Sequence, residues 1–520
     1  MLNFDNFLQN CSDIVIHSLH TSENCLFFIN DRGVDFINIG LLKNFSNINF
    51  CTPEKNLNYL LKKLDSRDWK TVKMNEEFEE KNNLIITFNN DFHSSLVECL
   101  EKKYKELPQN LVAVTGTNGK SSTVHFCNEI CGLLDKKSAS IGTLGLIGNA
   151  ITDISNINYN CELTTPDIAT MYRTLNKLAI QGLKNVFIEA SSHALHQGRF
   201  GNLKFDIAIF TNLSLDHLDY HKTMEDYFLS KKILFDKHLK KNGSVIINCD
   251  DEYGKRLSKL IDIKTITYGS KNCDFNILEY YEHNNNLECL IKSENFSKEF
   301  AFNFLSSFQL YNSLASILAI SELQKILPEN LLTNYSNKLA SPCGRFEFVA
   351  ENKNGGKFFV DFAHTPDALR NVLDFVRNNF TGKLICVFGC GGDRDNSKRP
   401  IMGKIAVEFC DLAIITDDNP RTEDPLLIRK QIITGIDEFS QENNLNIVKI
   451  DENFDSKIEN GKHIYEAQNR SEAIEFAVKI AQKNDIVIIA GKGHENYQIT
   501  GTTKHHFSDQ EEVRRIIEKS

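Results

Sequence analysis

The sequence has no apolar run that approaches the roughly 20 residues needed to span a bilayer. Its first five residues, Met1-Leu2-Asn3-Phe4-Asp5, offer no basic region followed by an apolar one, so no signal peptide is expected. Positive charge is also in deficit, because 59 Lys and Arg stand against 69 Asp and Glu, a formal net charge of −10. This balance argues against nucleic acid or an anionic membrane surface as the main partner. We therefore expect a cytoplasmic protein that binds no nucleic acid and does not insert into a membrane.

The 14 cysteines include no C-x-x-C pair and no Cys/His spacing typical of zinc sites. Several lie in apolar runs, which suits reduced core thiols of a cytosolic enzyme: Cys127, Cys131, Cys249, Cys386 and Cys390. The sequence also lacks internal repeats and long low-complexity tracts. With 41% hydrophobic and 25% charged residues, the composition is that of an ordinary globular protein.

The order of predicted strands and helices indicates an α/β protein of three domains. Residues 1–107 form a small α/β unit without an obvious catalytic cluster, and residues 108–340 alternate strands and helices, which implies a mostly parallel sheet of the P-loop ATPase type. Residues 341–520 alternate again and predict a Rossmann-like, doubly wound domain. Pro108 and Pro342 mark the predicted boundaries and are the expected hinges of domain closure.

A glycine-rich turn at residues 116–122 follows the apolar run 111–114 and opens a helical pattern that continues to about Leu134. Backbone N–H groups at the start of such a helix cradle phosphates, while Lys120 adds a positive charge and the Ser121 hydroxyl can reach Mg²⁺. A plain strand-to-helix turn is the alternative, but Gly-Lys-Ser-Ser directly after a strand favours an ATP site.

Three further polar clusters occur in the central region. Glu189 ends a predicted strand, where it suits either a Mg²⁺ ligand or a helix cap. The loop at residues 211–221 holds two His and two Asp. These residues are equally consistent with metal or acid–base chemistry and with an ordinary surface loop. Lys231 and Lys232 lie in an apolar helical pattern, where extension of both to solvent is the simpler interpretation and a functional buried lysine the alternative.

The C-terminal region places charged clusters after three predicted strands, at residues 389–395, 416–421 and 491–495. Its glycines allow close approach of a ligand, and its arginines can hold a carboxylate through two hydrogen bonds. Glu495 adds a carboxylate suited to an ammonium group. The pattern predicts a site for an amino acid with several charged ends.

The segment Gly116-Thr117-Asn118-Gly119-Lys120-Ser121-Ser122 resembles the signature of the Mur ligases, the ATP-dependent amino-acid-adding enzymes of peptidoglycan synthesis. The resemblance covers residues 108 to 510 and implies a UDP-binding, an ATP-binding and an amino-acid-binding domain. It implies addition of meso-diaminopimelate to UDP-N-acetylmuramoyl-L-alanyl-D-glutamate through an acyl phosphate, with release of ADP and phosphate. Such an enzyme serves cell-wall biogenesis, and hence cell shape and division. Its partners would be small molecules only, and a monomer is expected.

The resemblance also implies roles for single residues. Lys120, His217 and Lys231 would be catalytic, and the frame Tyr227…Leu234-Phe235 assigns the family's N-carboxylated lysine to Lys231 rather than Lys232. Two Mg²⁺ ions would be held by Ser121, Glu189, His217 and Lys231. ATP, the co-substrate, would contact Gly116, Thr117, Asn118, Gly119, Lys120, Ser121, Ser122, Asn312, Arg345 and Asp361. The UDP-MurNAc-dipeptide would contact Ser18, Thr164, Thr165, Ser191, Gln197 and Arg199. meso-Diaminopimelate would contact Arg394, Asp418, Asn419, Pro420, Arg421, Gly491 and Glu495.

Departures from the family pattern lie mainly near the N-terminus, where only Ser18 of His17-Ser18-Leu19 fits the usual Asp-Ser-Arg. Gln309 replaces a usual asparagine and keeps the amide. The Asp-Asn-Pro-Arg motif resembles the form that selects meso-diaminopimelate, whose distal carboxylate suits Arg421. The alternatives are a lysine-adding or other Mur-type ligase, a P-loop NTPase switch, and an inactive UDP-peptide-binding homologue.

Overall fold

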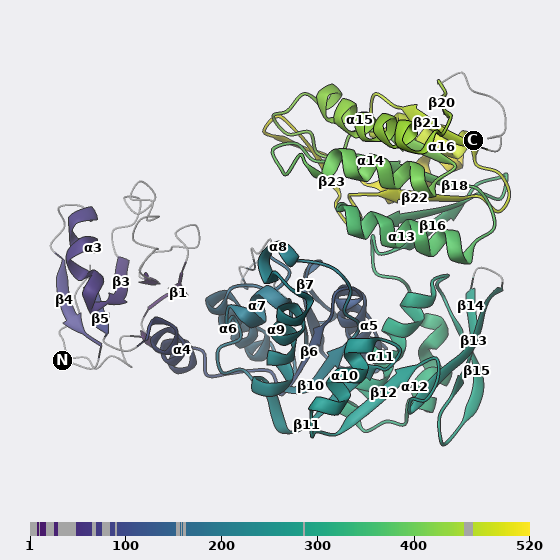
Figure 1. Cartoon of the computed structure of the whole chain (residues 1–520). Coiled ribbons are helices and arrows are strands. Elements are labelled where there is room, and N and C mark those ends of the chain that lie inside the picture. Colours follow the sequence, from purple (N-terminus) through teal and green to yellow (C-terminus); the bar gives the residue numbers. More distant parts are fainter. Residues whose placement is uncertain are drawn as a thin grey trace. The chain divides into compact units, whose positions relative to one another are not determined.

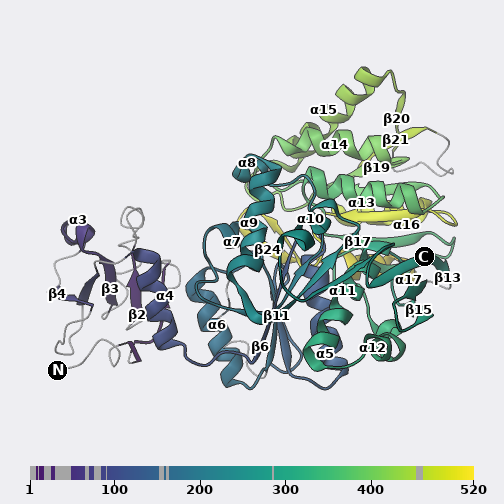
Figure 2. The same ribbon diagram turned by 60° about the horizontal axis from the view of Figure 1, so that its bottom comes forward.

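A computed structural model describes residues 8–9, 11–16, 25–29, 48–64, 69–74, 84–88, 91–151, 157, 159, 163–283, 286–451 and 461–519. Contacts divide the chain into two compact units. Unit 1 comprises Met1–Glu279, Leu290–Lys298 and Tyr311–Tyr335, and unit 2 comprises Tyr280–Cys289, Glu299–Leu310 and Ser336–Ser520. Both units alternate helices and strands (Figures 1 and 2), which confirms the predicted α/β class. None of the described helices has the length and apolarity to cross a membrane. The boundaries at residues 107 and 340 remain predictions.

The first sheet, drawn in purple in Figure 1, has the strand order β1-β2-β3-β5-β4, with every neighbouring pair parallel. Helix α4 (Phe92–Lys103) follows it, and its N-cap Asp91 accepts a hydrogen bond from the Ser94 amide. Ser18 lies outside the described residues. The strands are β1 (Ile14–Val15), β2 (Cys25–Phe28), β3 (Ile48–Pro53), β4 (Lys70–Lys73) and β5 (Leu84–Phe88).

The second sheet has ten strands in the order β15-β14-β13-β12-β11-β10-β6-β9-β7-β8. Its central pairs from β12 to β7 are parallel, as alternating strands and helices predict. The strand bounds are β6 (Asn110–Thr115), β7 (Ser138–Gly142), β8 (Gly145–Gly148), β9 (Asn185–Glu189), β10 (Phe205–Phe210), β11 (Leu239–Asn248), β12 (Thr265–Gly269), β13 (Phe275–His283), β14 (Asn286–Lys292) and β15 (Ser297–Phe302). The helices that follow these strands are α5 (Lys120–Leu133), α6 (Ile168–Ile180), α7 (Ser192–His196), α8 (Leu218–His221), α9 (Met224–Lys237), α10 (Glu252–Leu260), α11 (Ser307–Gln324) and α12 (Pro328–Tyr335).

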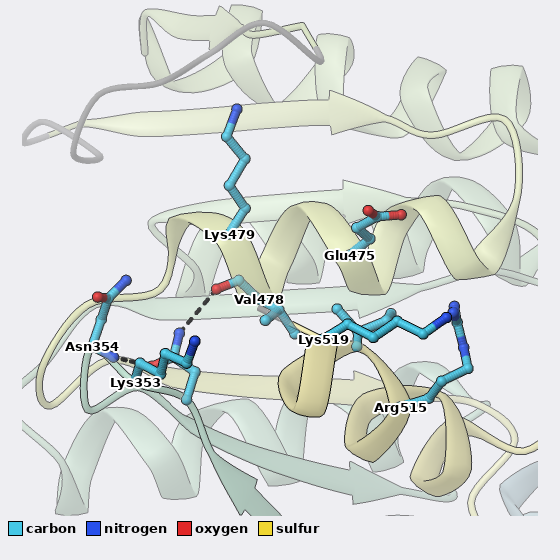
Figure 3. A pocket seen from close by; sticks show the side chains of 9 residues that line it. Lys353, Asn354, Glu475, Val478, Lys479, Arg515 and Lys519 are labelled. Carbon is cyan, nitrogen blue, oxygen red and sulfur yellow. Dashed lines mark hydrogen bonds between the residues drawn. The ribbon is translucent and has the colours of Figure 1, made fainter.

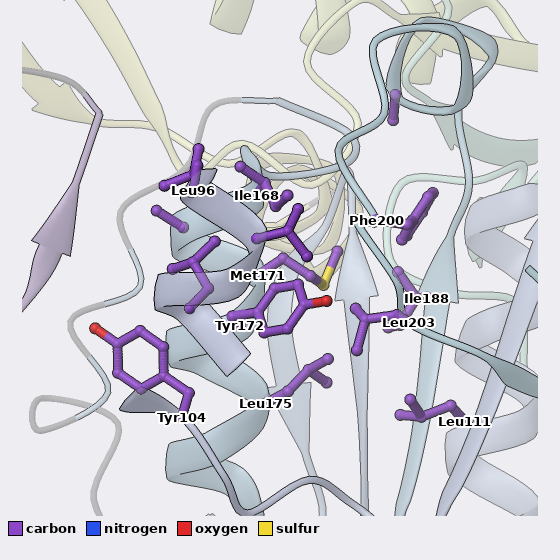
Figure 4. Packing of buried hydrophobic residues seen from close by; sticks show 14 of the residues in the cluster. Leu96, Tyr104, Leu111, Ile168, Met171, Tyr172, Leu175, Ile188, Phe200 and Leu203 are labelled. Atoms are coloured by element: carbon purple, nitrogen blue, oxygen red, sulfur yellow. The ribbon is translucent and has the colours of Figure 1, made fainter. Parts of the chain in front are cut away.

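Helices α4 and α6 pack together through an apolar cluster in unit 1 (Figure 4). The cluster includes Leu96 of α4, Tyr104 directly after α4, and Ile168, Met171 and Tyr172 of α6, and all five side chains are buried. This cluster continues into the strands around β6 and forms one hydrophobic core. Burial of such side chains stabilises the fold by about 1.5–3 kcal/mol each.

The third sheet, in unit 2, has the order β16-β17-β22-β18-β19-β21-β20. Within the described part of this sheet, the edge strand β16 is antiparallel to its neighbour and all other pairs are parallel. The sheet is therefore of the predicted doubly wound kind. The strands are β16 (Glu347–Glu351), β17 (Lys357–Asp361), β18 (Leu384–Phe388), β19 (Leu412–Ile415), β20 (Ile447–Lys449), β21 (Lys462–Glu466) and β22 (Ile486–Ala490), with the hairpin β23 (Tyr497–Thr500) and β24 (Thr503–His506). The helices are α13 (Pro366–Asn379), α14 (Lys398–Phe409), α15 (Pro425–Asn443), α16 (Arg470–Ile480) and α17 (Asp509–Lys519).

The expectation that Cys249 is a reduced core thiol is wrong. Cys249, at the end of β11, forms a disulfide with Cys273, which follows β12, and their Cα atoms are 6.5 Å apart. Because β11 and β12 are parallel neighbours, their carboxyl ends bring together two cysteines that lie far apart in the sequence. Cys127, Cys131, Cys386 and Cys390 are buried thiols, as expected.

Candidate active site

The glycine-rich turn connects the central strand β6 to α5, so residues 116–119 lie at the carboxyl edge of the sheet. Gly119 has φ +86°, and a Cβ there would lie 2.4 Å from Oδ1 of Asn312. A Cβ on Gly116 would lie 1.9 Å from Oγ1 of Thr211. Both positions therefore require glycine, and the turn leaves the first amides of α5 at the position where helices bind phosphates.

Two lysines converge on one backbone oxygen of this turn. The Lys120 amine donates to the carbonyl oxygens of Gly116, at 2.9 Å, and Thr117, at 2.7 Å. The Lys231 amine donates to the same Gly116 oxygen at 2.8 Å. Lys231 is only 1% exposed, so the interpretation that it extends to solvent is wrong. Its neighbour Lys232 instead reaches Asp236, at 2.6 Å, in an exposed ion pair.

Burial lowers the pKa of Lys231 well below its ordinary value, and the charge of Lys120 lowers it further. The amine lies 4.4 Å from the ring centre of Tyr227, and the Tyr227 hydroxyl is 3.2 Å from Oγ1 of Thr117. A lowered pKa favours the neutral, nucleophilic form of the amine. This arrangement joins α9 to the glycine-rich turn.

Glu189 ends β9, beside β6, and its side chain is 1% exposed. Its Oε1 accepts a hydrogen bond from the Thr143 amide at 2.8 Å. Glu189 does not cap the following helix, because Ser191 does so by accepting from the Ala194 amide. A carboxylate oxygen at Glu189 and the hydroxyl of Ser121, also buried, are the kind of donors that Mg²⁺ prefers.

His217 lies in the loop after β10, has φ +53°, and is nearly half exposed, with Nε2 3.4 Å from Oδ2 of Asp216. Among the residues that the structure describes, no three His, Cys, Asp or Glu side chains come together as a metal-binding group. The assignment of His217 and Lys231 as metal ligands therefore remains a prediction.

A cluster of histidines that the sequence did not predict surrounds His217. The ring centres of His193 and His217 are 4.9 Å apart, and those of His193 and His221 are 5.5 Å apart. Burial, followed by the charges of His193 and His196, lowers the pKa of His221 to about 4. The cluster forms because β9 and β10 flank β6, so that the loops after these two strands meet. Strand order, which the sequence does not reveal, was the missing information.

The residues predicted to hold the UDP-MurNAc-dipeptide form one hydrogen-bonded network next to Glu189. Oγ1 of Thr165 donates to the Glu189 carbonyl at 2.6 Å and lies 3.1 Å from Oγ of Ser191. The Arg199 guanidinium donates to the Thr165 carbonyl at 2.7 Å and to Oε1 of Gln197 at 2.6 Å. Thr164 joins through a 3.2 Å contact with the Thr143 hydroxyl. The structure thus brings together every described member of this set.

In unit 2, the predicted amino-acid site lies at the carboxyl ends of β18, β19 and β22. Arg421, with φ +51°, donates to the Gly392 carbonyl at 2.7 Å and so joins the loops after β19 and β18. Nδ2 of Asn419 donates to Oε2 of Glu495 at 3.0 Å, which joins the loop after β22. The rest of the set lies beside these residues. Cβ atoms built on Gly391, Gly392 and Gly491 would meet Arg394, Pro420 and Asp418 respectively.

The charged groups below this site are buried. Burial raises the pKa of Glu495, while the hydrogen bond from Asn419 opposes that shift. Arg470 and Asp509, neither of them exposed, form a two-point ion pair, and Arg470 also donates to the Ala490 carbonyl at the end of β22. No local sequence pattern indicates this pair, because its members lie on two different helices, α16 and α17.

The other residues predicted to bind ATP are divided between the two units. Asn312 lies beside Gly119 in unit 1. In unit 2 the Asp361 carboxylate accepts hydrogen bonds from the amides of Phe346 and Ala363, each at 2.8 Å. Burial raises the pKa of Asp361, and the positive charge of Arg345 opposes the shift. Gln309, the substituted amide, donates to the Arg345 carbonyl at 3.0 Å.

A hollow of about 450 Å³ elsewhere in unit 2 holds none of the predicted residues (Figure 3). It lies against α16 and α17, and Lys353, Lys479, Arg515 and Lys519 contribute cationic side chains to it. Because these long side chains lie at the surface, the hollow adds nothing to the site at the strand ends.

Comparison with known proteins agrees with this geometry. Residues 114–320 match the sequence model of the Mur ligase middle domain, and residues 344–493 match that of the Mur ligase, glutamate ligase domain. The UDP-N-acetylmuramoyl-L-alanyl-D-glutamate--2,6-diaminopimelate ligase of Rickettsia rickettsii is 39% identical over 454 residues, which cover 84% of this chain and 87% of that protein. The Aquifex aeolicus protein of the same name is 41% identical over 409 residues, covering 78% and 77% respectively.

Solved structures give the same result for the fold. A structure of a UDP-N-acetylmuramoyl-L-alanyl-D-glutamate--2,6-diaminopimelate ligase is 28% identical, with a TM-score of 0.61, and covers 100% of this chain and 99% of its own. The MurF ligase from Thermotoga maritima in complex with ADP is 15% identical, with a TM-score of 0.58, and covers 99% and 98%. The second likeness concerns the fold alone.

Proposed function

The chain belongs to the Mur ligase family, and from that premise we propose that it joins meso-diaminopimelate to UDP-N-acetylmuramoyl-L-alanyl-D-glutamate at the expense of ATP. The observation that carries the proposal is that each of the two units holds a site at its strand ends. One is the glycine-rich turn with Lys120 and Lys231, and the other is the cluster of Arg421, Asn419 and Glu495. The first suits a nucleotide triphosphate, and the second suits an amino acid with charged ends.

In the proposed reaction, a carboxylate oxygen of D-glutamate attacks the γ-phosphorus of ATP, and ADP leaves. The amine of meso-diaminopimelate then attacks the acyl phosphate, loses a proton and displaces inorganic phosphate, so that an amide bond forms. Lys120 neutralises charge that develops on the phosphates, and the amides at the start of α5 orient them. Mg²⁺, when bound, supplies further charge neutralisation, and the oxygen donors of Ser121 and Glu189 would hold it.

The burial of Lys231 supports the proposal that its amine is N-carboxylated. A neutral lysine amine can attack the carbon of CO₂ and release a proton, and this turns a potential cation into a carbamate anion. The full burial of Lys231 lowers its pKa and so favours the neutral amine that this reaction requires. The product would be an oxygen ligand in place of a buried amine, which suits a second Mg²⁺.

We predict that Lys231→Ala reduces the rate of phosphate release by at least about 100-fold and that added bicarbonate partly restores it. Lys232→Ala is the matched control, because Lys232 lies on the same helix but pairs with Asp236. Its rate should stay close to that of the wild type with or without bicarbonate. If bicarbonate does not raise the rate of Lys231→Ala, the carbamate on Lys231 is unsupported.

One assay tests the function as a whole: phosphate release from ATP with the UDP-MurNAc-dipeptide, comparing meso-diaminopimelate with L-lysine. We expect release only when all three substrates are present and meso-diaminopimelate is the amino acid. Preference for L-lysine would identify a lysine-adding ligase. ATP hydrolysis without the other two substrates would identify an NTPase switch, and dipeptide binding without turnover an inactive homologue.

We further propose that the enzyme acts as a monomer in the cytoplasm. The substrates named for its relatives are small molecules, which supports action in the cytoplasm. Light scattering of the purified protein with and without substrates measures the oligomeric state, and a mass twice that of the 59.3 kDa chain would contradict the monomer.

A further inference from the structure

Lys492 is a buried lysine inside the site of unit 2. It follows β22 in the segment Gly491–Glu495, between two residues of the predicted amino-acid site, and its side chain is 0% exposed. A lysine without exposure requires partners, because burial of an ammonium group is costly in free energy. Its partners therefore indicate what it is for.

The Lys492 amine connects three segments of the site. It donates to Oδ1 of Asn419 at 3.2 Å and to the Tyr497 carbonyl at 2.6 Å. It also lies 3.7 Å from Oε2 of Glu495. One amine thus holds the loop after β19, the loop after β22 and the first residue of β23 together.

These contacts fix the direction of the Asn419 amide. Its Oδ1 accepts from the Lys492 amine and also from the backbone N–H of Ile499 at 2.9 Å. With the oxygen engaged by two donors, Nδ2 must face Glu495, where it donates to Oε2 at 3.0 Å. Both Lys492 and Asn419 therefore lie next to Oε2 of Glu495.

The Lys492 amine lies among charged groups of both signs. Arg470 is matched to Asp509 by two hydrogen bonds. Lys492 then faces two further carboxylates, those of Asp418 and Glu495, which oppose the lowering of its pKa by burial. Glu495 also feels the positive charge of Arg421, so the charges at the site are mixed. A carboxylate held in place by Asn419 and Lys492 is the type of group that pairs with the ammonium group of a bound amino acid.

We propose that Lys492 is a positioning residue that holds Asn419 and Glu495 in the orientation that receives the ammonium group of the incoming amino acid. The inference rests on the proposed function, because it concerns the affinity for meso-diaminopimelate. Lys492 itself touches no reacting atom in this scheme. Its removal should therefore weaken binding of one substrate and leave the nucleotide site unchanged.

The test measures steady-state kinetics of phosphate release for Lys492→Met, Lys492→Ala and the wild type. We expect the KM for meso-diaminopimelate to rise by about ten-fold or more in both variants, since hydrogen bonds to a charged group are lost. The KM for ATP and for the UDP-MurNAc-dipeptide should stay within about two-fold, and kcat should fall less than the KM rises. Propylammonium should lower the raised KM of Lys492→Ala, whose missing atoms it replaces, but not that of Lys492→Met.

Lys462→Met is the matched control, because the Lys462 amine also donates to two backbone carbonyls, those of Glu408 and Cys410, each at 2.9 Å, outside the site. Its KM for meso-diaminopimelate should equal that of the wild type. An unchanged KM in the Lys492 variants, or an equal rise for all three substrates, overturns the proposal. Loss of the folding transition in both variants also overturns it, because Lys492 would then serve stability. Absence of turnover in the wild type would instead refute the proposed function.

Discussion

Lys231 places an amine in the protein interior against a carbonyl oxygen rather than against a carboxylate. Its pKa is lowered well below the ordinary 10.5 by burial, so the folded chain binds one proton fewer than the unfolded chain at pH values between the two pKa values. Because the unfolded state binds more protons, the free energy of unfolding rises with pH across that window and levels off above about 10.5.

This linkage predicts that the free energy of unfolding of the wild type gains up to about 1.4 kcal/mol per pH unit relative to Lys231→Met as pH rises towards 10. Urea unfolding in CO₂-free buffer at several pH values measures the difference. Lys232→Met should parallel the wild type, because its amine lies in an exposed ion pair. Equal slopes for wild type and Lys231→Met would contradict the assigned protonation state.

Arg421 is the residue expected to recognise the distal carboxylate of meso-diaminopimelate. Its guanidinium is held by the Gly392 carbonyl, and its backbone lies at φ +51°. Replacement by Ala should raise the KM for meso-diaminopimelate by about 10- to 100-fold, because a charge-assisted contact is lost. Arg421→Lys should recover only part of this, since lysine lacks the two-point geometry. Arg514→Ala, on the exposed face of α17, is the control, and an unchanged KM in Arg421→Ala would exclude the role.

At the level of single elements, Gly119 in the turn between β6 and α5 can be compared with Gly145, the first residue of β8, because both have the same backbone angle φ. Gly119 and Gly145 both have φ +86°, but a Cβ on Gly119 would lie 2.4 Å from Asn312, whereas one on Gly145 meets nothing within 4 Å. Gly145→Ala should cost only the conformational strain, about 1–2 kcal/mol.

Gly119→Ala should cost more than Gly145→Ala and should also weaken ATP binding, because Asn312 or the turn must move. Denaturant unfolding and titration with a non-hydrolysable ATP analogue measure the two effects. If both variants lose the same free energy and bind the analogue equally well, the close approach of Asn312 to the turn has no consequence.

The elements that could be predicted from sequence are those that local patterns specify. Apolar runs followed by glycine or charged motifs identified β6, β9, β10, β18, β19 and β22, and with them most of the site. Contacts that depend on strand order could not be predicted: His193 with His221, and Cys249 with Cys273. The burial of Lys231 could not be predicted either, because the apolar pattern of a helix does not show which element packs against each side chain. The pairing of Arg470 with Asp509 required the packing of α16 on α17.

At the scale of the whole molecule, the nucleotide turn belongs to unit 1 and the amino-acid site to unit 2. We predict that a non-hydrolysable ATP analogue with Mg²⁺, at about 100 times its Kd, stabilises the wild type by about 2.7 kcal/mol. Lys120→Ala should lose most of this stabilisation and keep any that meso-diaminopimelate provides. Scanning calorimetry measures both, and equal stabilisation of Lys120→Ala by the analogue would remove Lys120 from the nucleotide site.

The Gly116 carbonyl, shared by Lys120 and Lys231, makes the two amines thermodynamically dependent on each other. A phosphate that draws the Lys120 amine away leaves Lys231 as the donor to that oxygen, and a carbamate on Lys231 leaves the oxygen to Lys120. If Lys231 carries the proposed carbamate, nucleotide occupancy and lysine modification alter each other's equilibrium by the same factor, as reciprocity of coupled equilibria requires. Dissolved CO₂ would act in this enzyme as an effector of ATP affinity, and ATP as an effector of CO₂ uptake.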